Sequence, residues 1–136
     1  MNKIFLIDDD EDDQVFFKDA IRSIDPTLLC DIAINGQVAI DDLRISIALP
    51  DIIFLDLNMP IMNGFDFLVQ IKKEDKLNKI PVGIFSTSNI ISDKELSKKL
   101  GAIFFLTKPN EFQELCKKLQ QILTADFSND EFFLVS

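Results

Sequence analysis

The segment Asp51-Ile-Ile-Phe-Leu-Asp-Leu57 decides the fold class of this chain. Its continuous run of isoleucine, phenylalanine and leucine is typical of a strand that is buried on both faces of a parallel sheet. Asp56 stands near the end of that run. A carboxylate in such surroundings is costly unless a partner compensates its charge. We therefore expect a buried central strand that ends in a functional aspartate.

Short apolar runs and helix-like segments alternate on both sides of this strand. The other expected strands are Ile4–Ile7, Leu28–Ile34, Pro81–Phe85 and Ile103–Leu106, and the expected helices cover residues 12–24, 36–48, 64–74, 93–100 and 111–123. The fourth helix follows Ser92, with Glu95 three positions later, as in a capping box. Five βα units in a row predict an α/β fold with a parallel sheet and helices on both faces, and right-handed crossovers make it doubly wound. Residues 125–136 fit no βα unit and are too few for a second domain.

The amino-acid composition excludes several classes of functional site. The chain has 136 residues, of which 47% are hydrophobic and 27% charged, which suits one globular domain. It contains no His, and this excludes imidazole zinc sites and His-dependent triads. Its two cysteines predict buried reduced thiols, with a single long-range disulfide as the alternative.

Charge is negative and concentrated. The net charge is −9, so we expect no direct binding to nucleic acid, which requires a basic face. Six consecutive acids span Asp8–Asp13, and carboxylates grouped in this way suit a hard cation. The chain lacks a signal-peptide pattern and a long apolar run, so we expect a soluble cytoplasmic protein that does not bind a membrane.

The residues that follow the strands carry the chemistry. In a doubly wound sheet, ligands bind at the carboxyl ends of the strands. Acids, hydroxyls and one ammonium follow four of the strands, in Asp8–Asp10, Asp56–Asn58, Ser86-Thr87 and Thr107–Pro109. Oxygen ligands select Mg²⁺, Mn²⁺ or Ca²⁺, and a carboxylate can act as the nucleophile that forms an aspartyl phosphate.

Four stretches, in this order and spacing, resemble the receiver domain of two-component response regulators. They are Leu6–Asp10, Asp51–Gly64, Ile80–Thr87 and Gly101–Pro109, and the resemblance extends over about residues 2–123. It implies a flavodoxin-like (βα)5 fold with strand order 2-1-3-4-5. Residues 1–124 would form the receiver domain and 125–136 a C-terminal tail.

The resemblance also implies roles for the matching residues. Asp56 would be the phosphoacceptor and Lys108 its cationic partner. Asp8, Asp9, Asp56 and the backbone carbonyl of Asn58 would hold Mg²⁺, with Mn²⁺ as an alternative.

Three further expectations follow from the same resemblance. Ser86 would be the switch hydroxyl that moves toward the phosphoryl group, and Phe105 the aromatic switch residue, which here lacks a hydroxyl. The peptide bond between Lys108 and Pro109 would be cis, as is usual in the family.

Other polar residues favour structural roles. Asp10–Asp13 suit the positive N-terminal end of a helix, and Thr87 and Thr107 are expected to be structural. The apolar end Phe132–Val135 is either a disordered terminus or packs on its own domain or on a neighbour.

We therefore interpret the chain as a stand-alone, single-domain response regulator that is not an enzyme. A sensor histidine kinase or a histidine phosphotransfer protein would phosphorylate Asp56, and output would pass through protein–protein contact, either as a phosphorelay or through an altered surface. The expected output face is residues 91–122, with Lys94, Lys98, Lys99, Lys117 and Lys118, on a monomer or weak dimer. A plain solvated helix face is the alternative for these lysines.

Two other classes remain open. One is a pseudo-receiver, which keeps the fold and works without phosphorylation. The other is a metal-dependent phosphatase or hydrolase with an aspartate nucleophile. Such enzymes usually carry a second carboxylate two residues after the first and a capping segment. Here Asn58 stands two residues after Asp56, and 136 residues leave no room for a cap.

Overall fold

The structure is a computed structural model that describes residues 1–125 and 132–135, with side chains up to residue 125 and at Phe132. Six parallel strands form one sheet in the order β2-β1-β3-β4-β5-β6. The strands are β1 (Lys3–Ile7), β2 (Leu29–Ala33), β3 (Ile52–Leu55), β4 (Val82–Ser86), β5 (Phe104–Thr107) and β6 (Phe133–Val135). The helices are α1 (Glu11–Ile24), α2 (Gly36–Ile45), α3 (Gly64–Lys72), α4 (Ile91–Lys99) and α5 (Phe112–Leu123).

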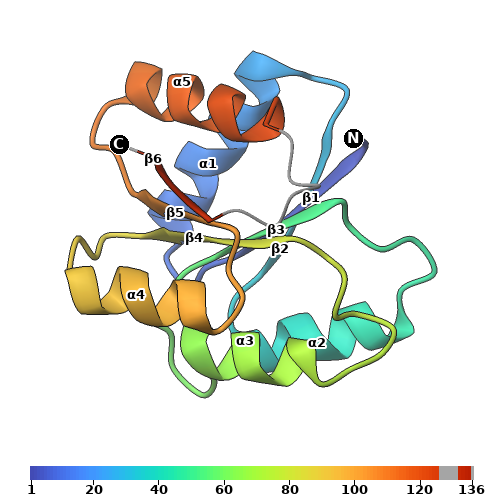
Figure 1. Ribbon diagram of the computed structural model, residues 1–136. Helices are drawn as coiled ribbons and strands as arrows, with labels where there is room; N and C mark the ends of the chain where they lie inside the picture. The colour runs from blue at the N-terminus through green and yellow to red at the C-terminus, as the bar shows by residue number, and fades with distance from the viewer. Residues whose placement is uncertain (126–131, 136) are drawn as a thin grey trace.

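The predicted fold is confirmed for the first five strands, which lie in the order 2-1-3-4-5. Helices α1 and α5 cover one face of the sheet, and α2, α3 and α4 cover the other (Figure 1). Among the residues that the structure describes, no helix has the length and hydrophobicity needed to cross a lipid bilayer.

The sixth strand corrects the prediction that residues 125–136 fit no βα unit. Strand β6 pairs in parallel with β5, with Phe104 opposite Phe133 and Leu106 opposite Val135, so β5, α5 and β6 form a further βαβ unit (Figure 1). Phe132, just before the strand, is half-buried against the core. Residues 132–135 therefore pack on this domain. The predicted domain limit at residue 124 stays a prediction.

Side chains of successive strand residues alternate between two cores. In β3, Ile52 and Phe54 face α1 and α5, whereas Ile53 and Leu55 face α2 and α3. The first core is rich in phenylalanine: the ring of Phe54 lies 5.0 Å from that of Phe17 and 5.2 Å from that of Phe104, between centroids. Both faces of the sheet are thus buried, which explains the continuous apolar runs in the sequence.

Two local expectations are wrong, and a third is confirmed only in part. Ser92 lies inside α4, whose N-cap position is Ile90 and has no side-chain cap. The Lys108–Pro109 peptide bond is trans, as are the other peptide bonds among the described residues. Cys30 and Cys116 are free thiols, as expected, but both are half-buried rather than buried.

The close contact between β4 and β5 depends on Gly83. A Cβ atom at this position would overlap the ring of Phe104 in the neighbouring strand, and that ring is fully buried. We expect Gly83→Ala to lower the free energy of unfolding by about 1–3 kcal/mol through overpacking. Thermal unfolding followed by circular dichroism would show a melting temperature lower by about 5–10 °C.

The matched control is the double variant Gly83→Ala/Phe104→Leu, in which the smaller side chain makes room for the new methyl group. In the Phe104→Leu background, Gly83→Ala should lower the melting temperature less than it does in the wild-type background. An unchanged melting temperature in Gly83→Ala would contradict this account.

Candidate functional site

Three carboxylates meet at the carboxyl edge of the sheet. Asp8 and Asp9 directly follow β1, and Asp56 directly follows β3, the adjacent strand. One carboxylate oxygen from each of the three residues lies within 4.8 Å of the others. Asp8 is 0% exposed and Asp56 6%, whereas Asp9 is exposed to solvent. The oxygens therefore converge from a buried wall and an open side, an arrangement that suits a hard divalent cation.

Backbone contacts hold the two buried aspartates in place. The Asp8 N–H donates to the carbonyl of Ala33 in β2 (3.0 Å), and the Asp56 N–H donates to that of Ile7 in β1 (2.9 Å). Both ladders thus continue one residue beyond the strands. Gly64, the first residue of α3, packs against the Asp56–Leu57 backbone: a Cβ there would lie 2.5 Å from the Asp56 carbonyl oxygen. The absence of a side chain lets α3 begin directly beside the aspartate.

Lys108 supplies a cation from the end of β5, which is two strands away from β3 in the sheet. It follows β5, and its ammonium nitrogen Nζ donates to Asp8 Oδ2 (2.8 Å) and to Asp13 Oδ2 (2.7 Å). Asp56 Oδ2 is farther away, at 3.7 Å. On its way the side chain passes the ring of Phe85 in β4, with Nζ 5.4 Å from the ring centroid. The side chain of Lys108 is only 9% exposed, so these contacts are shielded from water.

Burial dominates the electrostatics of the two aspartates. Desolvation raises the pKa of Asp56 to about 6, against a smaller opposing effect of the Lys108 charge and of backbone N–H groups of Asn58 and Leu57. Desolvation also raises the pKa of Asp8, although the hydrogen bond from Lys108 opposes it. The pKa of Lys108 is raised because its carboxylate partners outweigh desolvation. The site therefore holds more negative charge than its one lysine neutralises.

Asp13 is the site residue that sequence reasoning missed. It was expected to act only as an acid in the first turn of α1, and it does lie in that turn. Its carboxylate also forms the ion pair with Lys108. Asp10, three positions earlier, is the N-cap of α1 and accepts a hydrogen bond from the Asp13 N–H (3.1 Å). Within a run of six acids, no local pattern distinguishes the one whose side chain turns toward a lysine 95 positions away.

The remaining predicted residues lie around this cluster. The backbone N–H of Asn58 favours the charged form of Asp56 and so lowers the pKa of that carboxyl. Ser86 ends β4, is fully buried, and its Oγ accepts a hydrogen bond from the Ser88 N–H (3.2 Å). Phe105 is 1% exposed and packs on the α2–α3 side, with Lys94 Nζ 5.9 Å from its ring centroid. The predicted metal-binding and switch roles of these residues stay predictions.

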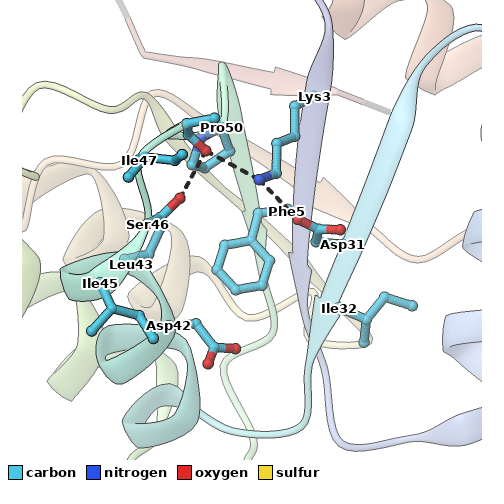
Figure 2. A pocket seen from close by; sticks show the side chains of 11 residues that line it. Lys3, Phe5, Asp31, Ile32, Asp42, Leu43, Ile45, Ser46, Ile47 and Pro50 are labelled. Carbon is cyan, nitrogen blue, oxygen red and sulfur yellow. Dashed lines mark hydrogen bonds and ion pairs between the residues drawn. The ribbon is translucent and has the colours of Figure 1, made fainter.

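A surface pocket of about 610 Å³ lies elsewhere, between β1, β2 and the segment after α2. Figure 2 shows Lys3 at its wall, where Nζ pairs with Asp31 (3.0 Å) and donates to the Ala48 carbonyl (3.0 Å). Apolar side chains, among them Phe5 and Leu43, supply much of the rest. The lysine is already paired, so the pocket offers little chemistry compared with the carboxylate edge.

The raised pKa of Asp56 predicts a pH-dependent stability. In the unfolded chain the carboxyl loses its proton near its ordinary pKa of 3.8, whereas in the folded chain it does so near 6. The folded state therefore binds the proton more tightly, and stability falls as the pH rises through this window. Without divalent cations, we expect Asp56→Asn to be more stable than the wild type by roughly 3 kcal/mol near pH 7, with little difference near pH 4.

Urea unfolding with a chelator, at a series of pH values, measures this difference. Asp66→Asn, which removes an exposed acid in the first turn of α3, serves as the control and should keep the wild-type pH profile. If the free energy of unfolding changed with pH in the same way for the wild type and Asp56→Asn, burial of the Asp56 carboxylate would not be what raises its pKa.

Comparison with known proteins agrees with this geometry. The model of the response regulator receiver domain family matches residues 4–120. Protein PilH of Pseudomonas aeruginosa is 36% identical over 76 residues, which are 56% of this chain and 63% of PilH. The probable transcriptional regulator ycf29 of Porphyra purpurea is 32% identical over 123 residues, which are 89% of this chain and 57% of ycf29. The chain thus spans less than two-thirds of the length of either relative.

Solved structures show the same fold. The phosphorylated cyanobacterial phytochrome response regulator RcpA is 28% identical with a TM-score of 0.83, and the match covers 94% of this chain and 95% of RcpA. The chemotaxis response regulator CheY4 of Vibrio cholerae is 26% identical with a TM-score of 0.76, covering 90% and 98% of the two chains. The response regulator Rcp1, solved in its Mn²⁺-bound form, is 28% identical with a TM-score of 0.73, covering 90% and 91%. On the family match, the shared fold and the acidic edge of its sheet, this chain belongs to the response regulator receiver domain family.

Proposed function

We propose that this chain accepts a phosphoryl group on Asp56, with a divalent cation held by Asp8, Asp9 and Asp56. The convergence of these three carboxylates beside the buried ammonium of Lys108 is the observation that carries the proposal. Receiver domains are signalling domains, and the match to RcpA, which was solved in its phosphorylated form, supports the same chemistry here.

The residues present fit Mg²⁺ or Mn²⁺. All three side chains offer carboxylate oxygens, which hard cations prefer, and the backbone carbonyl of Asn58 is the fourth ligand that we propose. The exposed position of Asp9 leaves the site open to solvent and to a phosphoryl donor. When bound, the cation neutralises negative charge on the carboxylates and on the incoming phosphoryl group.

The protein's own groups divide the remaining work. An Asp56 oxygen attacks phosphorus, the bond from phosphorus to a histidine nitrogen of the donor breaks, and the electron pair returns to that imidazole. Backbone N–H groups of Leu57 and Asn58 favour the charged form of the Asp56 carboxylate, which is the nucleophile. Lys108 contributes positive charge beside Asp56, and Ser86 offers a hydroxyl once it turns from Ser88.

The donor in this proposal is a partner protein, a sensor histidine kinase or a histidine phosphotransfer protein, because the sequence contains no His. We assign the output to α4, β5 and α5. On α4, Lys98 and Lys99 are exposed, while Lys94 covers Phe105 and donates to Asn89 Oδ1 (2.7 Å). This basic surface on an acidic protein suits an acidic partner.

Labelling with a small phosphodonor tests the proposal. Incubation with acetyl phosphate and Mg²⁺ should label the wild type with at most one phosphoryl group per chain, stable to acid and labile to base, as an acyl phosphate is. Asp56→Asn should abolish the label, since an amide is not a nucleophile here, and a chelator should suppress it. Intact-mass spectrometry measures the product.

Asp66→Asn is again the matched control, because it removes an exposed acid without touching the site, and it should label like the wild type. A wild-type protein that takes no label and binds no Mg²⁺ would overturn the proposal and favour a pseudo-receiver. Steady turnover of a small phosphoester would instead favour a hydrolase.

A further inference from the structure

The ammonium of Lys108 has a defined set of partners. A lysine ammonium carries three N–H donors. One points to Asp8 Oδ2 at 2.8 Å and a second to Asp13 Oδ2 at 2.7 Å. Asp56 Oδ2, at 3.7 Å, is beyond hydrogen-bond distance but is the next acid in the direction that remains. Two bonds of this kind fix the direction of the third donor, even though the lysine side chain itself is long and flexible.

Asp13 is well suited to fix the ammonium. It lies in the first turn of α1, a helix of 14 residues, and its own N–H is bonded to the side chain of Asp10, the helix N-cap. Its side chain is 34% exposed, so it forms the outer wall of the lysine site, whereas Asp8 forms the inner wall at 0%. Asp13 is not one of the three carboxylates that converge as a metal site.

We propose that Asp13 is a positioning residue for phosphoryl transfer: it holds the ammonium of Lys108 so that the third N–H faces the oxygens of a phosphoryl group on Asp56. This inference rests on the proposed function. A phosphoryl group on Asp56 extends beyond the carboxylate and closes the gap that separates Asp56 Oδ2 from Nζ. The lysine then reaches the phosphoryl group without giving up Asp8 or Asp13.

Charge alone gives the opposite expectation. Asp13 is an acid beside the place where a phosphoryl dianion forms, so simple repulsion would make its removal speed the reaction. Positioning makes its removal slow the reaction, because the ammonium then loses one of the two bonds that direct it. The sign of the effect therefore separates the two accounts.

The test compares Asp13→Ala with Asp12→Ala, an exposed acid in the same helical turn. Both variants remove one negative charge from the N-terminal end of α1, but only the first removes a contact to Lys108. We expect Asp13→Ala to slow labelling by phosphoramidate with Mg²⁺ by about 3- to 10-fold and to weaken beryllofluoride binding similarly, while Asp12→Ala stays within about two-fold of the wild type. Mg²⁺ affinity without phosphodonor should change little in either variant.

Two further variants distinguish positioning from a general effect. Asp13→Asn keeps an oxygen that can accept from Lys108, so its rate should lie between those of the wild type and Asp13→Ala. In a Lys108→Gln background, Asp13→Ala should have no further effect, because the residue acts only through the lysine. Melting temperatures of all variants confirm that each is folded at the temperature of the assay.

The outcomes that overturn the inference are specific. Equal rates for Asp13→Ala and Asp12→Ala, a faster Asp13→Ala, or an undiminished effect in the Lys108→Gln background each exclude positioning. A wild type that takes no label overturns the proposed function itself, whereas a labelled wild type with equal alanine variants overturns only the role of Asp13.

Discussion

The buried ammonium of Lys108 is the interaction on which the carboxyl edge of this domain depends. Asp8 is withdrawn from solvent completely and Asp56 almost completely, and a buried carboxylate is tolerable only with a compensating partner. The cation that reaches both comes from β5, with β3 and β4 between it and β1. The long side chain of Lys108 spans this distance by extending along the Phe85 ring. The strand order therefore determines which lysine can compensate the two buried aspartates.

The rest of the fold keeps that arrangement rigid. Both faces of the sheet are closed by apolar side chains, and glycine is used where two elements must touch: Gly83 admits the Phe104 ring and Gly64 admits the Asp56–Leu57 backbone. The carboxylates then stand on strand ends that are held from both sides. Such support lets a site retain an excess of negative charge in the absence of a cation, at some cost in stability.

The sequence predicts those features that leave a strong hydrophobic pattern or place a polar residue in an unusual context. The five apolar runs gave the strands, and an aspartate at the end of such a run, as at Asp56, is conspicuous because burial makes it costly. The contact of Asp13 with Lys108 could not be predicted, since six adjacent acids look alike until helix α1 turns one of them inward. Ser92 resembled a cap because the capping pattern is local, whereas α4 begins two residues earlier, after Ile90. Strand β6 is three residues long, too short for any periodicity to show.

Strand β6 has a practical consequence for anyone who attaches a reporter to this protein. Its pairing places Phe133–Val135 beside β5, with Val135 opposite Leu106, only two residues before Lys108. A fluorescent protein or affinity tag joined there would hang next to the functional edge and to the surface formed by α4, β5 and α5. Lys3, by contrast, begins β1 at the opposite end of the strands. A reporter attached near Lys3 would therefore lie farther from the functional edge than one attached next to Val135.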